Sequence, residues 1–265
     1  MNSNFYSHTL AITHSEFVKT VKAPSFWPLI LAPVIPVLVI SLFIYIMSYD
    51  EFLVRIQSTN NDPDPYNYLW KWFGIFFNFF LMPYYAIFLV WFFEIERKAN
   101  AWKYLNCLPL KFSTIFFSKV ATAMTLVAFI QMVTAVSLLI AGLVLKLSKP
   151  DWPFDQYPMF SVSSISVTFF SIYILSMPAF IIFFLLIQRF DNPGLFIVLA
   201  IVVGLLGFSL NPFHFHGHGL ILYQDLRAGK PLDFDFLYVA SMLCILMLAI
   251  LRVYSVNLQR ILFKL

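Results

Sequence analysis

Charged residues are scarce in this sequence, because Asp, Glu, Lys and Arg together make up only 11% of its 265 residues and hydrophobic residues make up 61%. A soluble domain of this length needs more polar surface than that to cover its apolar side chains. The mean hydropathy of +0.83 therefore favours an integral membrane protein. The net charge of +4 does not indicate nucleic-acid binding, since the basic residues are scattered at the ends of apolar runs.

Cysteines and common catalytic motifs are also rare or absent. Cys107 lies in a predicted cytoplasmic segment and Cys244 in a predicted membrane span, so we expect neither a disulfide nor a cysteine metal site. The sequence contains no Walker A, G-x-S-x-G or H-E-x-x-H motif. Ionisable residues are nearly absent from the apolar runs, which disfavours a proton-coupled carrier. We therefore expect no cofactor on this chain and an energy source on another polypeptide.

Six apolar stretches are long enough to approach the roughly 20 helical residues that cross a bilayer. They predict an all-α membrane protein with a single transmembrane domain over residues 1–265, because a β-barrel needs alternating polar positions that these stretches lack. The first stretch has no cleavage site after it, so we expect it to stay in the mature protein. The fifth is short and contains glycines, which predicts either a tilted partial span or half of a re-entrant pair with the fourth. The six spans are 26–48, 70–93, 119–145, 162–187, 194–210 and 234–255.

The lysines and arginines near the span ends predict that both termini are cytoplasmic, in the inner membrane of the cell. Tryptophans fall at several span ends, as expected for an interfacial aromatic belt. The basic residues assigned to the cytoplasm are Lys19, Lys22, Arg97, Lys98, Lys103, Lys111, Lys119, Arg189, Arg252, Arg260 and Lys264. Those assigned to the outside are fewer, namely Arg55, Lys71, Lys146, Lys149, Arg227 and Lys230.

The segment before the first span predicts an amphipathic helix over residues 8–23 that lies on the inner leaflet. Its Thr-x-x-Glu sequence has the spacing of a capping box, which predicts a helix start at Thr13. Pro24 and Pro28 separate this helix from the span that follows. The residues that we assign to its function are Thr13, Glu16, Phe17, Lys19 and Lys22.

A charged segment follows the second span and predicts a cytoplasmic helix. Glu94 and Lys98 have the i,i+4 spacing of a favourable ion pair, and an apolar stripe that includes Trp102 runs beside them. Pro109 ends the predicted helix. Two interpretations remain open from these residues alone: a helix that binds a partner, and an interfacial helix that only anchors the two neighbouring spans.

This segment resembles the cytoplasmic loop of permeases of ABC-2 type transporters, most of all the lantibiotic-immunity and bacitracin-resistance branch. The length, the N-terminal helix and the six predicted spans agree with the resemblance. It implies a coupling helix that docks into a cleft of a nucleotide-binding subunit, with the N-terminal helix beside it. The residues that carry the resemblance are Glu94, Glu96, Arg97, Lys98, Trp102, Lys103, Leu108 and Pro109.

Three alternate histidines form a rival candidate site. His214, His216 and His218 would point to one side of an extended loop and have the side chains that bind zinc or copper. A polar outer loop without metal is the simpler interpretation, and we favour it.

Together these patterns predict the membrane subunit of an ABC exporter for an amphipathic peptide or lipid-like substrate. The resemblance implies ATP and Mg on a partner ATPase, a second permease copy or a homologue, and contact with membrane lipids. Two alternatives stay open: a membrane-embedded metalloenzyme that uses the histidine cluster, and a scaffold or sensor subunit that transports nothing.

Overall fold

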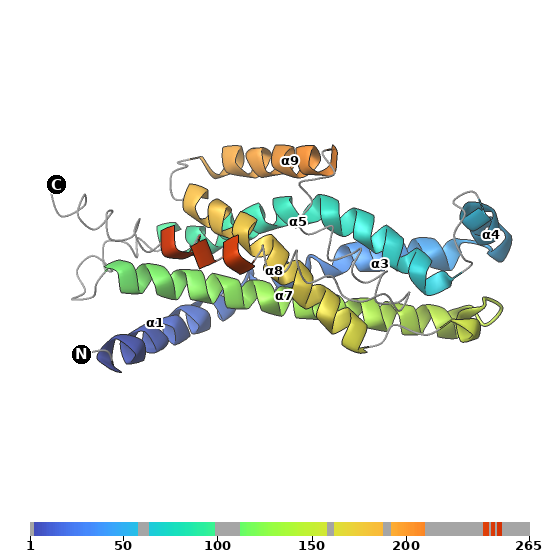
Figure 1. Cartoon of the computed structure of the whole chain (residues 1–265), viewed down its shortest axis with the longest axis horizontal. Coiled ribbons are helices and arrows are strands. Elements are labelled where there is room, and N and C mark those ends of the chain that lie inside the picture. Colours follow the sequence, from blue (N-terminus) through green and yellow to red (C-terminus); the bar gives the residue numbers. More distant parts are fainter. Residues whose placement is uncertain are drawn as a thin grey trace.

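A computed structural model describes residues 3–57, 64–98, 112–157, 162–187 and 192–209, and most of 241–250. Within these ranges every regular element is helical, which confirms the all-α prediction (Figure 1). The elements are α1 (Ser3–Val21), α2 (Phe26–Leu31), α3 (Val34–Ile46), α4 (Tyr49–Gln57), α5 (Pro65–Lys98), α7 (Phe112–Ser148), η1 (Phe154–Gln156), α8 (Val162–Ile187) and α9 (Pro193–Ser209).

Two helices in the described ranges are long and apolar enough to cross a membrane, Thr114–Ser148 and Ile165–Ile187. Two bent helix pairs raise this number to four if each pair counts as one span. The fifth predicted span corresponds to α9, whose apolar part is shorter than a full crossing, and most of the sixth lies outside the described residues. The structure therefore supports a membrane protein, and the number six stays a prediction.

The predicted first span, 26–48, is not one helix. It consists of α2 and α3, which are separated at Ala32 and Pro33, and α3 is followed by a turn of 109° into α4. Proline has no backbone N–H, so Pro33 and Pro36 cannot continue the helical hydrogen bonds of α2 across this point. Hydropathy showed that the stretch is apolar, but the prolines decide that it is broken.

Proline also bends α5. The helical segments Pro65–Phe77 and Phe79–Ile95 meet at 48°. Pro83 lies inside this helix, and its ring clashes with the carbonyl of the residue four positions earlier, Phe79. The bend therefore falls one turn before the proline, and it shapes the middle of the helix bundle.

Two helices begin with the same combination of a capping side chain and a proline. Asp64 Oδ1 accepts hydrogen bonds from the backbone N–H groups of Tyr66, at 2.9 Å, and Asn67, at 3.2 Å. Asn192 Oδ1 likewise accepts from the N–H groups of residues 194 and 195, at 2.9 and 3.3 Å. In both cases proline occupies the first helical position, where no N–H is needed.

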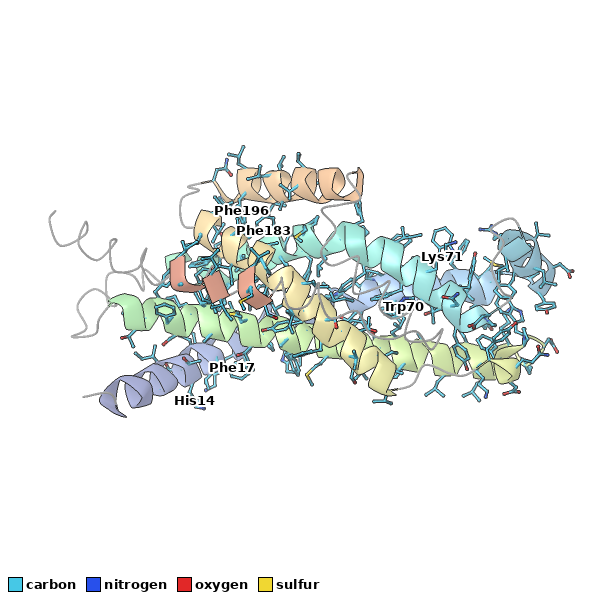
Figure 2. All side chains as sticks on the ribbon, in the orientation of Figure 1. His14, Phe17, Trp70, Lys71, Phe183 and Phe196 are labelled. Carbon is cyan, nitrogen blue, oxygen red and sulfur yellow. The ribbon has the colours of Figure 1, made fainter. Side chains whose placement is uncertain are left out.

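Helix α7 lies along the length of the molecule and contacts α1, α3 and α8, whereas α5 packs against α3, α8 and α9 (Figure 1). Aromatic rings fill the space between these helices. The ring centroids of Tyr85 in α5 and Phe180 in α8 are 5.3 Å apart. Those of Phe183 in α8 and Phe196 in α9, both labelled in Figure 2, are 5.6 Å apart. Large apolar side chains on the outer faces remain exposed, as expected for surfaces that contact lipid.

Candidate functional site

Two helix ends and part of α1 lie at one end of the molecule, on the left of Figure 1. Helix α5 ends there at Lys98, helix α7 begins at Phe112, and α1 lies against the first turns of α7. The segment between Lys98 and Phe112, which contains Trp102, Lys103, Leu108 and Pro109, is outside the described residues. Its two attachment points are described, and they define the candidate site.

The charged residues that begin the predicted coupling helix belong to α5. This helix continues without interruption through Glu94, Glu96, Arg97 and Lys98, so these residues extend the membrane helix rather than form a separate element. The side chain of Glu94 is half-buried. The side chains of residues 96–98 are outside the described part, and the ion pair of Glu94 with Lys98 stays a prediction.

Aromatic contacts hold the last turns of α5 in place. The ring of Phe93 is buried 5.1 Å from the ring of Phe184 in α8. Two residues earlier, Trp91 Nε1 donates a hydrogen bond of 2.6 Å to Ser25 Oγ in the link between α1 and α2. The base of the predicted coupling segment is therefore fastened both to α8 and to the end of the N-terminal helix.

A buried ion pair joins α1 to α7. Glu16 Oε2 lies 3.5 Å from Lys119 Nζ, and the two side chains are 10% and 2% exposed. Lys19, a more exposed residue one turn along α1, lies 3.7 Å from the same carboxylate oxygen. Charges buried this deeply require a partner of opposite sign, so the pair sets how the two helices face each other.

Small hydroxyl residues line α7 where α1 approaches it. Thr114, Ser118 and Thr122 are spaced four residues apart and are all buried. The hydroxyls of Ser118 and Thr122 donate to carbonyls one turn back, at 2.9 and 2.8 Å, and Thr122 Oγ1 also lies 3.4 Å from the carbonyl oxygen of Thr13. Small residues with internally satisfied hydroxyls allow two helices to approach closely.

The predicted capping box at Thr13 is wrong, because α1 begins at Ser3 and Thr13 lies in its interior. A capping residue needs non-helical backbone angles, and an interior residue cannot have them. The carboxylate of Glu16 contacts Lys119 instead. Of the remaining residues assigned to this helix, Phe17 and Lys22 are exposed (Figure 2 for Phe17), and Lys19 reaches Glu16.

The role of Lys119 was not predicted from the sequence, in which it stands at a span boundary like an ordinary cytoplasmic lysine. The signal that was present is the spacing of the hydroxyls at 114, 118 and 122, which marks one side of α7 as a close helix contact. Lys119 follows one of these positions directly. Nothing in that spacing points to Glu16 as its partner.

The three histidines of the alternative metal site, His214, His216 and His218, lie outside the described residues. In the ranges that the structure describes, no group of three or more His, Cys, Asp or Glu residues is placed to hold a metal ion. The metal-site hypothesis therefore gains no support and stays untested.

Comparison with known proteins identifies the family of this chain. Residues 12–209 match the family described as ABC-2 family transporter protein. No curated protein and no solved structure matches the chain. The matched region begins within α1, includes the ion pair of Glu16 with Lys119 and ends with α9. Because the match covers well over half of its length, this chain belongs to the ABC-2 family of transporter proteins.

Proposed function

We propose that this protein is the membrane-spanning permease subunit of an ABC exporter, in which residues 94–109 form the coupling helix. A separate ATPase subunit binds ATP and Mg and docks against this helix. Two permease copies, or one copy and a homologue, complete the transporter in the inner membrane, with both termini in the cytoplasm. The substrate is an amphipathic peptide or a lipid-like molecule, as in the lantibiotic-immunity and bacitracin-resistance branch.

The observation that supports this proposal best is the way the attachment points of the coupling segment are held. The end of α5 packs on α8 through Phe93 and Phe184 and is tied to Ser25 through Trp91. The start of α7 is tied to α1 through Lys119 and Glu16. A displacement of a segment held in this way is transmitted to α1, α7 and α8 together, because packed helices move as units.

The proposal assigns a mechanical role to the ATPase partner. When the ATPase subunits close on ATP, they displace the coupling helix, and the displacement tilts α5 and α7 relative to the second permease copy. The bend in α5 and the break between α2 and α3 are points at which such a motion changes helix packing at low cost.

The test is copurification of this chain with an ATPase encoded beside it, followed by measurement of ATP hydrolysis. We expect the native pair to copurify, and a Glu94→Lys, Trp102→Ala double variant to lose the ATPase, because it reverses a charge and removes the aromatic anchor of the docking surface. Asp50→Lys is the control, since it reverses an exposed acidic charge in α4 at the opposite end of the molecule. It should bind the ATPase as the native chain does.

Two results would contradict the proposal. If no neighbouring ATPase binds the native chain, the assignment as an ABC permease subunit is wrong. If the double variant retains its ATPase as fully as Asp50→Lys does, the coupling helix lies elsewhere. Both variants should first be shown to insert and purify normally, so that loss of binding is not loss of folding.

A further inference from the structure

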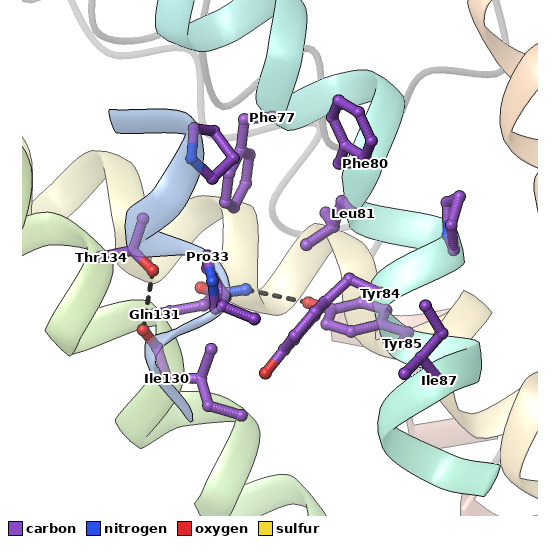
Figure 3. A pocket seen from close by; sticks show the side chains of 13 residues that line it. Pro33, Phe77, Phe80, Leu81, Tyr84, Tyr85, Ile87, Ile130, Gln131 and Thr134 are labelled. Atoms are coloured by element: carbon purple, nitrogen blue, oxygen red, sulfur yellow. Dashed lines mark hydrogen bonds between the residues drawn. The ribbon is translucent and has the colours of Figure 1, made fainter. Parts of the chain in front are cut away.

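An apolar cavity of about 180 Å³ lies where the break between α2 and α3 faces the bend of α5 (Figure 3). Pro33 and Pro36 line it on one side and Pro83 on the other, and α7 forms its floor. A single water needs roughly 10–15 Å³, and an apolar cavity of roughly 150 Å³ is enough to hold an aromatic ring. The broken helices therefore leave room for a ring-sized group.

The floor of the cavity carries a chain of hydrogen bonds across three helices. Gln131 of α7 lies 2.9 Å from the hydroxyl of Tyr85 in α5, which in turn lies 2.7 Å from Ser176 Oγ in α8. Ser176 Oγ donates to the carbonyl oxygen of Tyr173, at 3.0 Å. All three polar side chains are buried, and Gln131 is only 4% exposed.

The order of donors in this chain follows from the number of protons available. Ser176 has one hydroxyl proton, and it goes to the carbonyl of Tyr173, so the hydroxyl of Tyr85 must donate to Ser176 Oγ. Tyr85 then has no proton left for Gln131 and must accept from its Nε2. The amide of Gln131 is thereby oriented, and its Oε1 is left as an acceptor.

This oxygen has no donor among the residues that the structure describes. Gln131 lines the cavity together with Thr134, whose hydroxyl donates to the carbonyl of Ile130 at 2.9 Å and so gives Gln131 no proton (Figure 3). A buried acceptor without a donor costs free energy. Neighbouring atoms cover this oxygen, so a group that enters the cavity with an N–H or O–H must displace them to reach it, and the hydrogen bond would then remove this cost.

The cavity opens at the outer face of the helix bundle. Among its lining residues, Phe80 and Ile87 are 46% and 42% exposed on the face of α5 that we assign to lipid. The hydroxyl of Tyr84 closes another side by donating to the carbonyl of Leu29, at 3.2 Å. No charged side chain lines the cavity. The opening toward lipid and the uncharged lining therefore favour an uncharged group that enters from within the bilayer.

We propose that this cavity is a binding site for a ring-sized apolar group that carries one uncharged O–H or N–H donor, with Gln131 Oε1 as the acceptor. A phenol-like or indole-like group of an amphipathic molecule has this chemistry. The further role of the cavity as part of the substrate path rests on the proposed function as an exporter. Binding itself does not, because it requires only this chain.

The test compares two probes that differ in a single hydroxyl, 4-fluorophenol and fluorobenzene, by fluorine NMR on the full chain in lipid nanodiscs. We expect saturable binding of 4-fluorophenol that excess phenol displaces, above the linear signal from probe dissolved in lipid. Gln131→Leu should lower the affinity for 4-fluorophenol about tenfold, which corresponds to the loss of one hydrogen bond, and should leave the affinity for fluorobenzene unchanged. Met132→Leu changes an exposed neighbouring position of α7 and should leave the affinity for both probes unchanged.

A second variant keeps the test decisive if Gln131→Leu does not fold. Ala32→Leu places a larger side chain among the cavity-lining residues and should abolish binding of both probes. Absence of saturable phenol binding to the native chain would overturn the proposal, as would equal phenol affinity in native chain and Gln131→Leu. Unchanged binding to folded Ala32→Leu would place the site elsewhere and also refute it.

Competition then distinguishes two sources of the same chemistry. Displacement of 4-fluorophenol by a short apolar peptide with tyrosine indicates a peptide substrate, and displacement by a short-chain monoacylglycerol indicates a lipid. These measurements use no ATPase. If the chain binds phenol but no ATPase copurifies with it, only the proposed exporter function is refuted. If an ATPase copurifies but phenol does not bind, only the proposed binding site is refuted.

Discussion

The two ends of the helix bundle are held together by different forces. At the predicted cytoplasmic end, α1 and α7 meet through a buried ion pair, Glu16 with Lys119, beside a line of hydroxyl residues. At the opposite end, α4 and the turn after α7 meet through aromatic rings, with Phe52 stacked 4.3 Å from Trp152. An ion pair demands one orientation of its helices, whereas stacked rings tolerate small shifts.

The charged residues at this opposite end, which is the predicted outer end of the molecule, differ from the buried pair at the predicted cytoplasmic, or inner, end. Lys146 and Asp155 are 2.7 Å apart, but the carboxylate is 86% exposed. Lys149 donates to the carbonyl of Met47 at 3.2 Å and lies over the rings of Tyr45 and Trp152. Exposed pairs contribute little because water screens them. Buried apolar area therefore stabilises the outer end, whereas at the inner end a charge pair that water does not reach fixes how the helices face each other.

The largest loss of stability should come from removing only one member of the ion pair between Glu16 and Lys119. Glu16→Leu removes the carboxylate opposite a buried ammonium group, which costs about 4 kcal/mol in comparable buried pairs. Lys119→Met should cost less, because Lys19 also contacts Glu16. The measurement is the free energy of unfolding in mixed micelles titrated with SDS.

The double variant Glu16→Leu, Lys119→Met sharpens this comparison. Replacing both members of a buried pair by apolar residues is often neutral or stabilising, so the double variant should recover most of the loss. A double variant as unstable as Glu16→Leu alone would show that the loss does not come from an unpaired buried charge, and this explanation of the inner end would be wrong.

Trp152→Ala should have the next largest effect. It removes a buried ring that stacks on Phe52 and lies 6.1 Å from the ring of Phe154, and such truncations cost about 3 kcal/mol or more. Because the loss is apolar area, Trp152→Phe should restore most of the stability in the same SDS titration. Failure of phenylalanine to rescue would mean that a specific contact of the indole, and not apolar area, holds the outer end.

The smallest effect should come from Asp155→Asn. The change removes an ion pair with Lys146 in which the lysine and aspartate side chains are 40% and 86% exposed, so the unfolding midpoint should not move measurably at physiological salt. A clear loss of stability that disappears at high salt would show that charge matters at the outer end as well, and the contrast between the two ends would fail.

The same local pattern had opposite outcomes at two places, and this shows the limit of sequence inference. Thr13 and Glu16 have the spacing of a capping box but lie inside α1. Ser48 and Glu51 have the same spacing and do form one: Ser48 N donates to Glu51 Oε2 at 3.3 Å, and Glu51 N donates to Ser48 Oγ at 3.2 Å. Met47 before it has extended backbone angles, so a helix can start there.

Much of the architecture followed from the residues alone. Continuous apolar runs with few charges require helices in a bilayer, since lipid offers no hydrogen bonds to the backbone, and the structure and the family match both agree. The bend of α5 could be expected from Pro83, and the start of α9 from Asn192 and Pro193. The candidate coupling residues rest on resemblance, and those after Lys98 lie outside the described residues.

The sequence by itself determined that this is a helical membrane protein, because apolar length, proline positions and capping side chains act locally along the chain, and its match over residues 12–209 determined the family. Only the tertiary structure decided which polar groups meet. Glu16 forms an ion pair with Lys119, and Gln131 forms a hydrogen bond with Tyr85, in each case between two different helices. Such pairings depend on how far each helix is rotated and shifted against its neighbours, and hydropathy contains no information about that rotation.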